Sequence, residues 1–187
     1  MSGGPRDTAL IAVDVQRDFL PGGSLAVPDG DQVIAPLARL APHAGVVIAT
    51  RDFHPAAHCS FAAQGGVWPP HCVIGTAGAE IAPEIDAVAE LVVSKGMHPD
   101  AEAYSGFDGT GLAEILRVRG VERVIIGGLA TDYCVRATAL AALAAGFATT
   151  VVADAIRAVD ATPGDGERAL AEMRTAGVDV REMQFVG

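Results

Sequence analysis

Six short runs of apolar, largely β-branched residues alternate with longer segments of helical pattern, and this alternation restricts the fold more than any other feature of the chain. The runs are apolar throughout, which is typical of strands that are covered on both faces of a sheet. Strands are expected at residues 9–13, 45–50, 91–93, 121–126, 148–152 and 179–181, and helices at 32–40, 111–118, 133–145 and 166–175. We therefore predict a single domain over residues 1–187, a three-layer α/β/α sandwich with a mainly parallel, six-stranded sheet.

The composition excludes several classes of function. A formal net charge of −10 repels phosphate backbones and anionic lipid, so we expect no nucleic-acid partner. No run of about 18 apolar residues occurs, so we expect no membrane span. The three cysteines are an odd number and suggest no disulfide framework, and the N-terminal residues lack a signal-peptide pattern. We expect a cytoplasmic protein, and the sequence leaves open whether it forms a homo-oligomer.

Two long segments, residues 16–29 and 51–78, lack a regular pattern and are rich in Gly, Pro, His and aromatic residues. Long loops in a compact domain usually carry function. Ligands of open α/β sheets bind beyond the carboxyl ends of the strands. The distinctive polar residues of this chain end or follow predicted strands: Asp14, Asp52, His54, Lys95 and Cys134.

Cys134 is the candidate nucleophile. A buried strand is expected to end in two glycines, turn, and open a helix that Thr131 or Asp132 can cap. Cys134 then lies in the first turn of this helix, where unpaired N–H groups and the positive end of the dipole favour thiolate over thiol. For Cys59 and Cys72, which lack such a setting, the better interpretation is a small buried hydrophobic side chain.

Asp14 and Lys95 are the candidate charged partners of Cys134. Asp14 interrupts an apolar strand, where an unpaired carboxylate is costly, so we expect it to have a partner. Lys95 ends another apolar strand and is the only lysine beside twelve arginines, which indicates a specific need for an ammonium group. A structural ion pair between the two is also compatible with catalysis, since Lys95 could orient Asp14 beside Cys134.

Asp52, His54 and His71 are the candidate metal ligands. In an extended segment residues two apart point the same way, so Asp52 and His54 can bind one ion together, and His71 returns from a Pro-rich loop. Two imidazoles and one carboxylate suit one divalent ion of Zn, Mn or Fe and leave coordination positions open. A hydrogen-bonded loop network without metal is the alternative. His58 and Ser60 are candidates for a second shell around the ligands.

Three aromatic residues are candidates for lining a substrate pocket. Phe19, Trp68 and Tyr104 lie in or near the long loops and could surround a flat ring. Ordinary packing beneath the loops explains each of them, taken alone, equally well.

Taken together, these stretches resemble the nicotinamidase/pyrazinamidase family within the isochorismatase-like cysteine hydrolases. The resemblance runs from residue 12 to about residue 157 and rests on VDVQRDF (13–19), RDFHP (51–55), HCSF (58–61), WPPHCV (68–73), KG (95–96), YSGF (104–107) and GLATDYCV (128–135). Gly106 and Ile74 stand where such enzymes commonly have Ala and Gln, and both departures are expected to alter the pocket.

The resemblance implies an Asp–Lys–Cys triad, matched here by Asp14, Lys95 and Cys134, and metal ligands at the three positions given above. It also implies a cis peptide bond before Thr131 and an oxyanion hole formed by the backbone N–H groups of Ala130 and Cys134. Family members bind the pyridine nitrogen at the metal and serve the salvage of NAD.

The implied function is hydrolysis of nicotinamide to nicotinate and ammonia through a thioester on Cys134, with pyrazinamide as a further amide substrate. A related cysteine hydrolase for another amide, ureido or lactam compound is the alternative within this fold. A non-haem Fe(II) oxygenase built on a facial triad is the alternative from another class, and it leaves Cys134 and Lys95 without a role.

Overall fold

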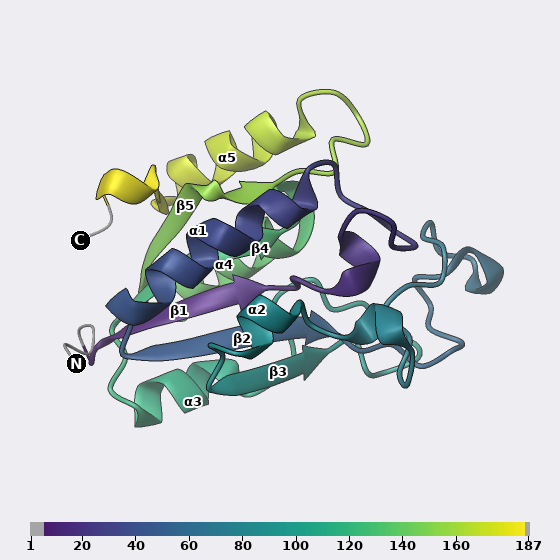
Figure 1. Ribbon diagram of the computed structural model, residues 1–187, viewed down its shortest axis with the longest axis horizontal. Helices are drawn as coiled ribbons and strands as arrows, with labels where there is room; N and C mark the ends of the chain where they lie inside the picture. The colour runs from purple at the N-terminus through teal and green to yellow at the C-terminus, as the bar shows by residue number, and fades with distance from the viewer. Residues whose placement is uncertain (1–5, 186–187) are drawn as a thin grey trace.

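The computed structural model describes residues 6–185 and contains the predicted three-layer α/β/α arrangement (Figure 1). All six strands are parallel, and they lie side by side in the order β3-β2-β1-β4-β5-β6. The strands are β1 (Thr8–Val13), β2 (Val46–Asp52), β3 (Leu91–Lys95), β4 (Arg123–Leu129), β5 (Ala148–Arg157) and β6 (Asp179–Arg181).

Five α-helices cover the two faces of the sheet: α1 (Ile34–Leu40), α2 (Pro83–Asp86), α3 (Leu112–Val118), α4 (Arg136–Ala144) and α5 (Asp165–Ala176). Figure 1 shows α1 and α2 in front of the sheet and α4 behind it. None of the helices in the described part of the chain is long and apolar enough to cross a membrane.

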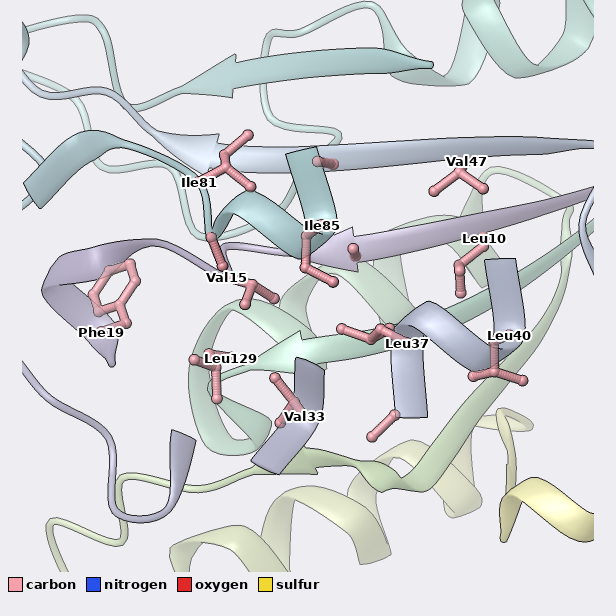
Figure 2. Packing of buried hydrophobic residues seen from close by; sticks show 14 of the residues in the cluster. Leu10, Val15, Phe19, Val33, Leu37, Leu40, Val47, Ile81, Ile85 and Leu129 are labelled. Carbon is pink, nitrogen blue, oxygen red and sulfur yellow. The ribbon is translucent and has the colours of Figure 1, made fainter. Parts of the chain in front are cut away.

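The four central strands, β1, β2, β4 and β5, contribute to two apolar cores, because successive side chains point to opposite faces of the sheet. On the face of α1 and α2, Leu10 and Val47 from the strands gather with Leu37 and Ile85 from the helices (Figure 2). On the face of α3, α4 and α5, the core includes Ile11, Ile48, Leu116, Ala139 and Met173. Covering both faces explains why the strands read as continuous apolar runs.

Several predicted boundaries differ from the structure. The segment 32–40 begins with a 3₁₀ turn, Gly30–Val33, before α1, and β5 continues to Arg157 instead of ending at 152. The single turn α2 was not predicted, because four residues are too few to display a helical period. The glycines expected to end helices, Gly120, Gly146 and Gly177, all have positive φ as predicted.

The helix expected at 133–145 begins earlier and in two parts, a π-helical turn (Thr131–Val135) followed by α4. The predicted cap by Thr131 or Asp132 is wrong, since neither side chain caps the turn. The Asp132 carboxylate instead accepts the N–H groups of Val159 and Asp160, at 3.0 and 2.9 Å. The Asp132 carboxylate therefore binds the loop after β5 and is not available to cap the start of the helix.

The two glycines before this helix also differ from expectation, because β4 runs through them to Leu129 and they form no turn. A Cβ atom on Gly128 would lie 2.1 Å from the carbonyl oxygen of Val13 in β1, and Gly128 has a φ of +124°. Only glycine allows β4 to approach β1 this closely in that conformation. The strand order reverses between β1 and β4, and such switch points are where α/β sheets bind ligands.

We expect Gly128→Ala to lower the free energy of unfolding by about 3 kcal/mol or more, through a strained φ and overpacking against β1. Urea denaturation followed by circular dichroism measures this change. Gly146→Ala is the matched control, since Gly146 has a φ of +93° but nothing within 4 Å of an added Cβ. Equal losses in the two variants would show that the contact with β1 is unimportant.

Candidate active site

Asp14, Lys95 and Cys134 meet at the carboxyl edge of the sheet, and all three are buried. The Lys95 Nζ atom lies 2.9 Å from Asp14 Oδ2 and 3.5 Å from Cys134 Sγ. Asp14 directly follows β1, Lys95 is the last residue of β3, and Cys134 lies in the π-helical turn after β4. Because parallel strands end at the same edge, these three distant parts of the sequence converge on one point.

Lys95 has a second acidic partner that the sequence did not predict. Its Nζ atom donates a 2.5 Å hydrogen bond to Asp52 Oδ1 and a 3.1 Å bond to the carbonyl oxygen of Ala103. Asp52 and Lys95 are register partners at the ends of β2 and β3. Aligning the predicted ends of these two strands would have predicted this contact, since residues at equivalent positions on neighbouring strands lie side by side.

Asp14 Oδ2 is placed to accept a proton. It forms a 2.9 Å ion pair with the Lys95 ammonium, and no other donor among the described residues occupies it. The open position on Oδ2 and the nearby Cys134 thiol are therefore complementary.

Burial dominates the protonation of this cluster. It raises the pKa of the Cys134 thiol well above its usual value, and Lys95 offsets only part of that effect. Burial likewise raises the pKa of the Asp14 carboxyl against the opposing influence of Lys95. Burial acts to lower the pKa of Lys95, but the carboxylates of Asp14 and Asp52 prevail and hold it well above the ordinary value.

Burial thus favours the thiol form of Cys134 and opposes the expected effect of the helix start, so a neighbouring base is needed to take its proton. Loss of solvation outweighs the dipole of a single turn. Asp14, with a raised pKa, is a stronger base than an exposed carboxylate, and Lys95 stays charged. The cluster can thus transfer a proton from sulfur to carboxylate when a reaction requires it.

Asp52, His54 and His71 form a set of donors that fits a metal ion. One ligand atom from each of these buried residues lies within 4.8 Å of the others. The Nδ1 atoms of His54 and His71 each lie 2.8 Å from a carbonyl oxygen, of Gly96 and Pro69 respectively. If Nδ1–H donates to these carbonyls, both Nε2 lone pairs are free for a metal, the usual arrangement around histidine ligands.

His58 lies behind this set, whereas Ser60 lines the same small pocket as the three donors. The His58 ring stacks on His54 with 4.1 Å between centroids. Its Nδ1 lies 2.7 Å from Ser60 Oγ, and its Nε2 lies 3.1 Å from the carbonyl oxygen of Ala101. With both ring nitrogens occupied, His58 supports the orientation of His54.

A cavity connects the thiol with the metal-binding set. Phe19, Trp68 and Tyr104 line it as expected, together with Asp52, His71, Ala130 and Cys134. The Trp68 indole donates a 3.2 Å hydrogen bond to the Tyr104 hydroxyl. The sequence missed the other lining residues, because these are ordinary apolar or aromatic residues brought in from several elements: Leu25, Val27, Leu129, Tyr133 and Val159.

Neither Gly106 nor Ile74 lines this cavity directly. Ile74 is 44% exposed, and its N–H group donates to the carbonyl oxygen of His54. Gly106 instead lies against Thr50, where an added Cβ would be 2.8 Å from the Thr50 Cγ2 methyl.

The cis peptide bond lies between Leu129 and Ala130, one residue earlier than expected. The Ala130 carbonyl accepts the N–H groups of Tyr133 and Val135, both at 3.1 Å. The peptide unit between Ala130 and Thr131 is therefore already part of the helical turn, which requires the trans form.

Two further residues of the first loop organise the site, and the sequence did not identify them. The Gln16 side chain accepts the N–H of Asp52 at 2.7 Å and donates to its carbonyl oxygen at 2.8 Å. Asp18 Oδ2 accepts the N–H of Cys72 at 2.7 Å, next to His71. Asp14, Gln16 and Asp18 alternate along one segment, and each fixes a different part of the site.

Three comparisons with known proteins bear on this site. A model of the isochorismatase domain matches residues 8–184. The nicotinamidase/pyrazinamidase of Mycobacterium tuberculosis is 45% identical over 92% of this chain and 97% of its own length. The structure of the pyrazinamidase of Pyrococcus horikoshii in complex with zinc is 48% identical, with a TM-score of 0.88 over 94% of this chain and 99% of that one. PnC1 from L. infantum in complex with nicotinate is 36% identical, with a TM-score of 0.91 over 97% and 96%.

We expect Gln16→Leu to weaken binding of Zn²⁺ by about 10- to 100-fold, because the backbone of Asp52 loses its clamp. Competition with a chromogenic chelator measures the affinity. Gln64→Leu, an exposed glutamine in a short 3₁₀ helix, is the control and should bind Zn²⁺ as the unmodified protein does. Unchanged affinity in Gln16→Leu would show that Asp52 does not depend on this clamp.

Proposed function

This chain belongs to the isochorismatase family, and from that membership and the geometry of its pocket we propose that it is a nicotinamidase, which hydrolyses nicotinamide to nicotinate and ammonia. One observation carries the proposal: a single aromatic-lined cavity exposes a cysteine thiol beside a buried base and also reaches a divalent-metal donor set. A ring carboxamide needs both features, one for its amide carbon and one for its ring nitrogen.

The cavity suits a small aromatic amide. Phe19, Trp68 and Tyr104 offer flat surfaces against which a ring can pack. Asp52, His54 and His71 would hold the metal, which when bound supplies a Lewis acid for the ring nitrogen. The L. infantum relative in complex with nicotinate supports a pyridine carboxylate as product, and the name of the M. tuberculosis relative supports pyrazinamide as a further substrate.

In the first half of the proposed reaction, Asp14 Oδ2 takes the proton of the Cys134 thiol. The thiolate attacks the carboxamide carbon, and the N–H groups of Ala130 and Cys134 stabilise the resulting oxyanion. Asp14 then gives its proton to the departing nitrogen. The C–N bond breaks, ammonia leaves, and a thioester on Cys134 remains.

In the second half, a water molecule enters the place that ammonia left. Asp14 takes a proton from this water as its oxygen attacks the thioester carbon. The C–S bond breaks and Asp14 returns the proton to the Cys134 sulfur. Nicotinate leaves, and the thiol and the carboxylate are restored for the next cycle.

Lys95 keeps its charge throughout this cycle. The two carboxylates beside it raise its pKa, so it is a poor proton donor and a steady counter-charge. It sets the position of Asp14 Oδ2 and lies within 3.5 Å of the sulfur, where negative charge develops. We assign Lys95 the role of holding the Asp14 carboxylate and the Cys134 sulfur in position for the reaction.

The metal and the setting are also part of the proposal. Zinc, iron and manganese all suit the donors, and the zinc in the P. horikoshii relative favours zinc. A cytoplasmic role in NAD salvage is consistent with three cysteines that form no disulfide within the described residues. The oxygenase alternative is disfavoured by the thiol that opens into this cavity beside a buried base.

We expect Cys134→Ala to lose nicotinamide hydrolysis by at least about 10⁴-fold, because the nucleophile is removed, while Zn²⁺ affinity is unchanged. Ammonia release, measured with nicotinamide, pyrazinamide and a panel of other small amides, tests the activity and the substrate together. Cys59→Ala, a half-buried cysteine outside the cavity, is the control and should keep full activity. Substantial turnover by Cys134→Ala would defeat the assignment of the nucleophile.

We expect kcat/KM to fall with decreasing pH around a midpoint above 3.8, the ordinary pKa of an aspartate. Asp14 must be ionised to take the thiol proton, and burial raises its pKa, so its base form is lost earlier as the pH falls. The pH profile of nicotinamide hydrolysis measures the midpoint, with metal content determined at each pH to exclude loss of the ion. A midpoint at or below 3.8 in fully loaded enzyme would contradict the role of Asp14.

A further inference from the structure

The carboxylate of Asp14 is held by a residue that the mechanism above does not use. The Thr50 hydroxyl donates a 2.6 Å hydrogen bond to Asp14 Oδ1, and both residues are completely buried. We propose that Thr50 is a positioning residue that fixes which oxygen of Asp14 serves as the base. This proposal rests on the proposed function of Asp14.

Thr50 also holds the main chain of Asp14. The Asp14 N–H group points to Thr50 and lies 3.2 Å from both its carbonyl oxygen and its Oγ1. Asp14 has a φ of +49°, in the left-handed region that residues other than glycine seldom adopt. Such a conformation persists only where neighbouring groups impose it, and the contacts with Thr50 do so from the adjacent strand β2.

The hydrogen bond from Thr50 to Oδ1 gives the two carboxylate oxygens of Asp14 different roles. Oδ1 accepts the hydrogen bond of Thr50, whereas Oδ2 forms an ion pair with the Lys95 ammonium at 2.9 Å and has no other donor beside it. Without the hydroxyl, Oδ1 would be a buried carboxylate oxygen with no partner in the protein, which is costly. The carboxylate would then turn to share both oxygens with Lys95, and neither would be kept free for the Cys134 proton.

The rotamer of Thr50 is set by its surroundings. Its Cγ2 methyl lies against Gly106, so close that an added Cβ there would be 2.8 Å away. A β-branched side chain has few allowed rotamers, so seating the methyl directs the hydroxyl. Thr50 is thus a rigid donor, and the geometry of the base depends on it and on Lys95 alike.

The test compares Thr50→Val, which removes the hydroxyl while keeping the shape, with Thr50→Ser, which restores the hydroxyl. We expect Thr50→Val to lower kcat for nicotinamide by about 10- to 100-fold, part of what a general base contributes, with KM changed less than about twofold. Thr50→Ser should recover kcat to within about threefold of the unmodified enzyme. If Thr50→Val does not fold, Thr50→Ala takes its place.

Thr149→Val is the matched control, since Thr149 is buried and its hydroxyl donates to the Phe147 carbonyl, away from the cavity. It should keep kcat even if it loses stability to urea. A Thr50→Val or Thr50→Ala enzyme with unchanged kcat overturns the proposal. So does a Thr50→Ser enzyme as slow as Thr50→Val, because the hydroxyl would then not be the cause.

The rate at which iodoacetamide alkylates Cys134, followed by mass spectrometry, separates this proposal from the identity of the substrate. If the unmodified protein releases no ammonia from nicotinamide, the proposed function fails, but the alkylation still reports on the base. We expect Thr50→Val to slow alkylation of Cys134 and Thr50→Ser to restore it. Equal alkylation rates in all variants overturn the role of Thr50 whatever the substrate is.

Discussion

The ammonium group of Lys95 is the interaction on which the rest of the site depends. It is buried between the carboxylates of Asp14 and Asp52, and the Cys134 sulfur completes its surroundings. Burying any one of these charges alone would cost several kcal/mol, and only their mutual contact makes the cluster tolerable. Three strand ends must therefore meet within hydrogen-bonding distance. The parallel sheet, the close approach of β4 to β1, and the clamps of the first loop all serve that convergence.

Much of the fold could be predicted from the sequence because its signals are local. Short runs rich in apolar and β-branched residues identified most of the strands, and the single lysine drew attention to Lys95. The boundaries that differed depend on contacts between distant segments, which no local pattern contains. The glycines of β4 are needed by the neighbouring strand, and Asp132 is taken by the loop after β5.

In the site too, some residues were predictable from local sequence signals and others depend on contacts between distant segments. The residue types that react were visible as polar residues at strand ends. The residues that hold them were not, because Gln16, Asp18 and Thr50 are common residue types that act through main-chain groups or a single hydroxyl. The direction in which the pKa of Cys134 shifts was also hidden, since it follows from how completely the fold encloses the thiol. This burial arises only when the helices and the sheet pack together, so no local sequence pattern reveals it.

The two oxygens of Asp52 point to different neighbours: Oδ1 pairs with Lys95, and Oδ2 lies 3.7 Å from His54 Nε2 in the metal-binding set. One side chain therefore belongs to two centres at once. The catalytic triad and the metal-binding set therefore cannot be lost independently of each other during evolution. If a descendant lost Asp52 together with the metal ion, the buried ammonium of Lys95 would lose one of its two carboxylates. Such a descendant would need a replacement acidic residue, or it would have to lose Lys95 as well.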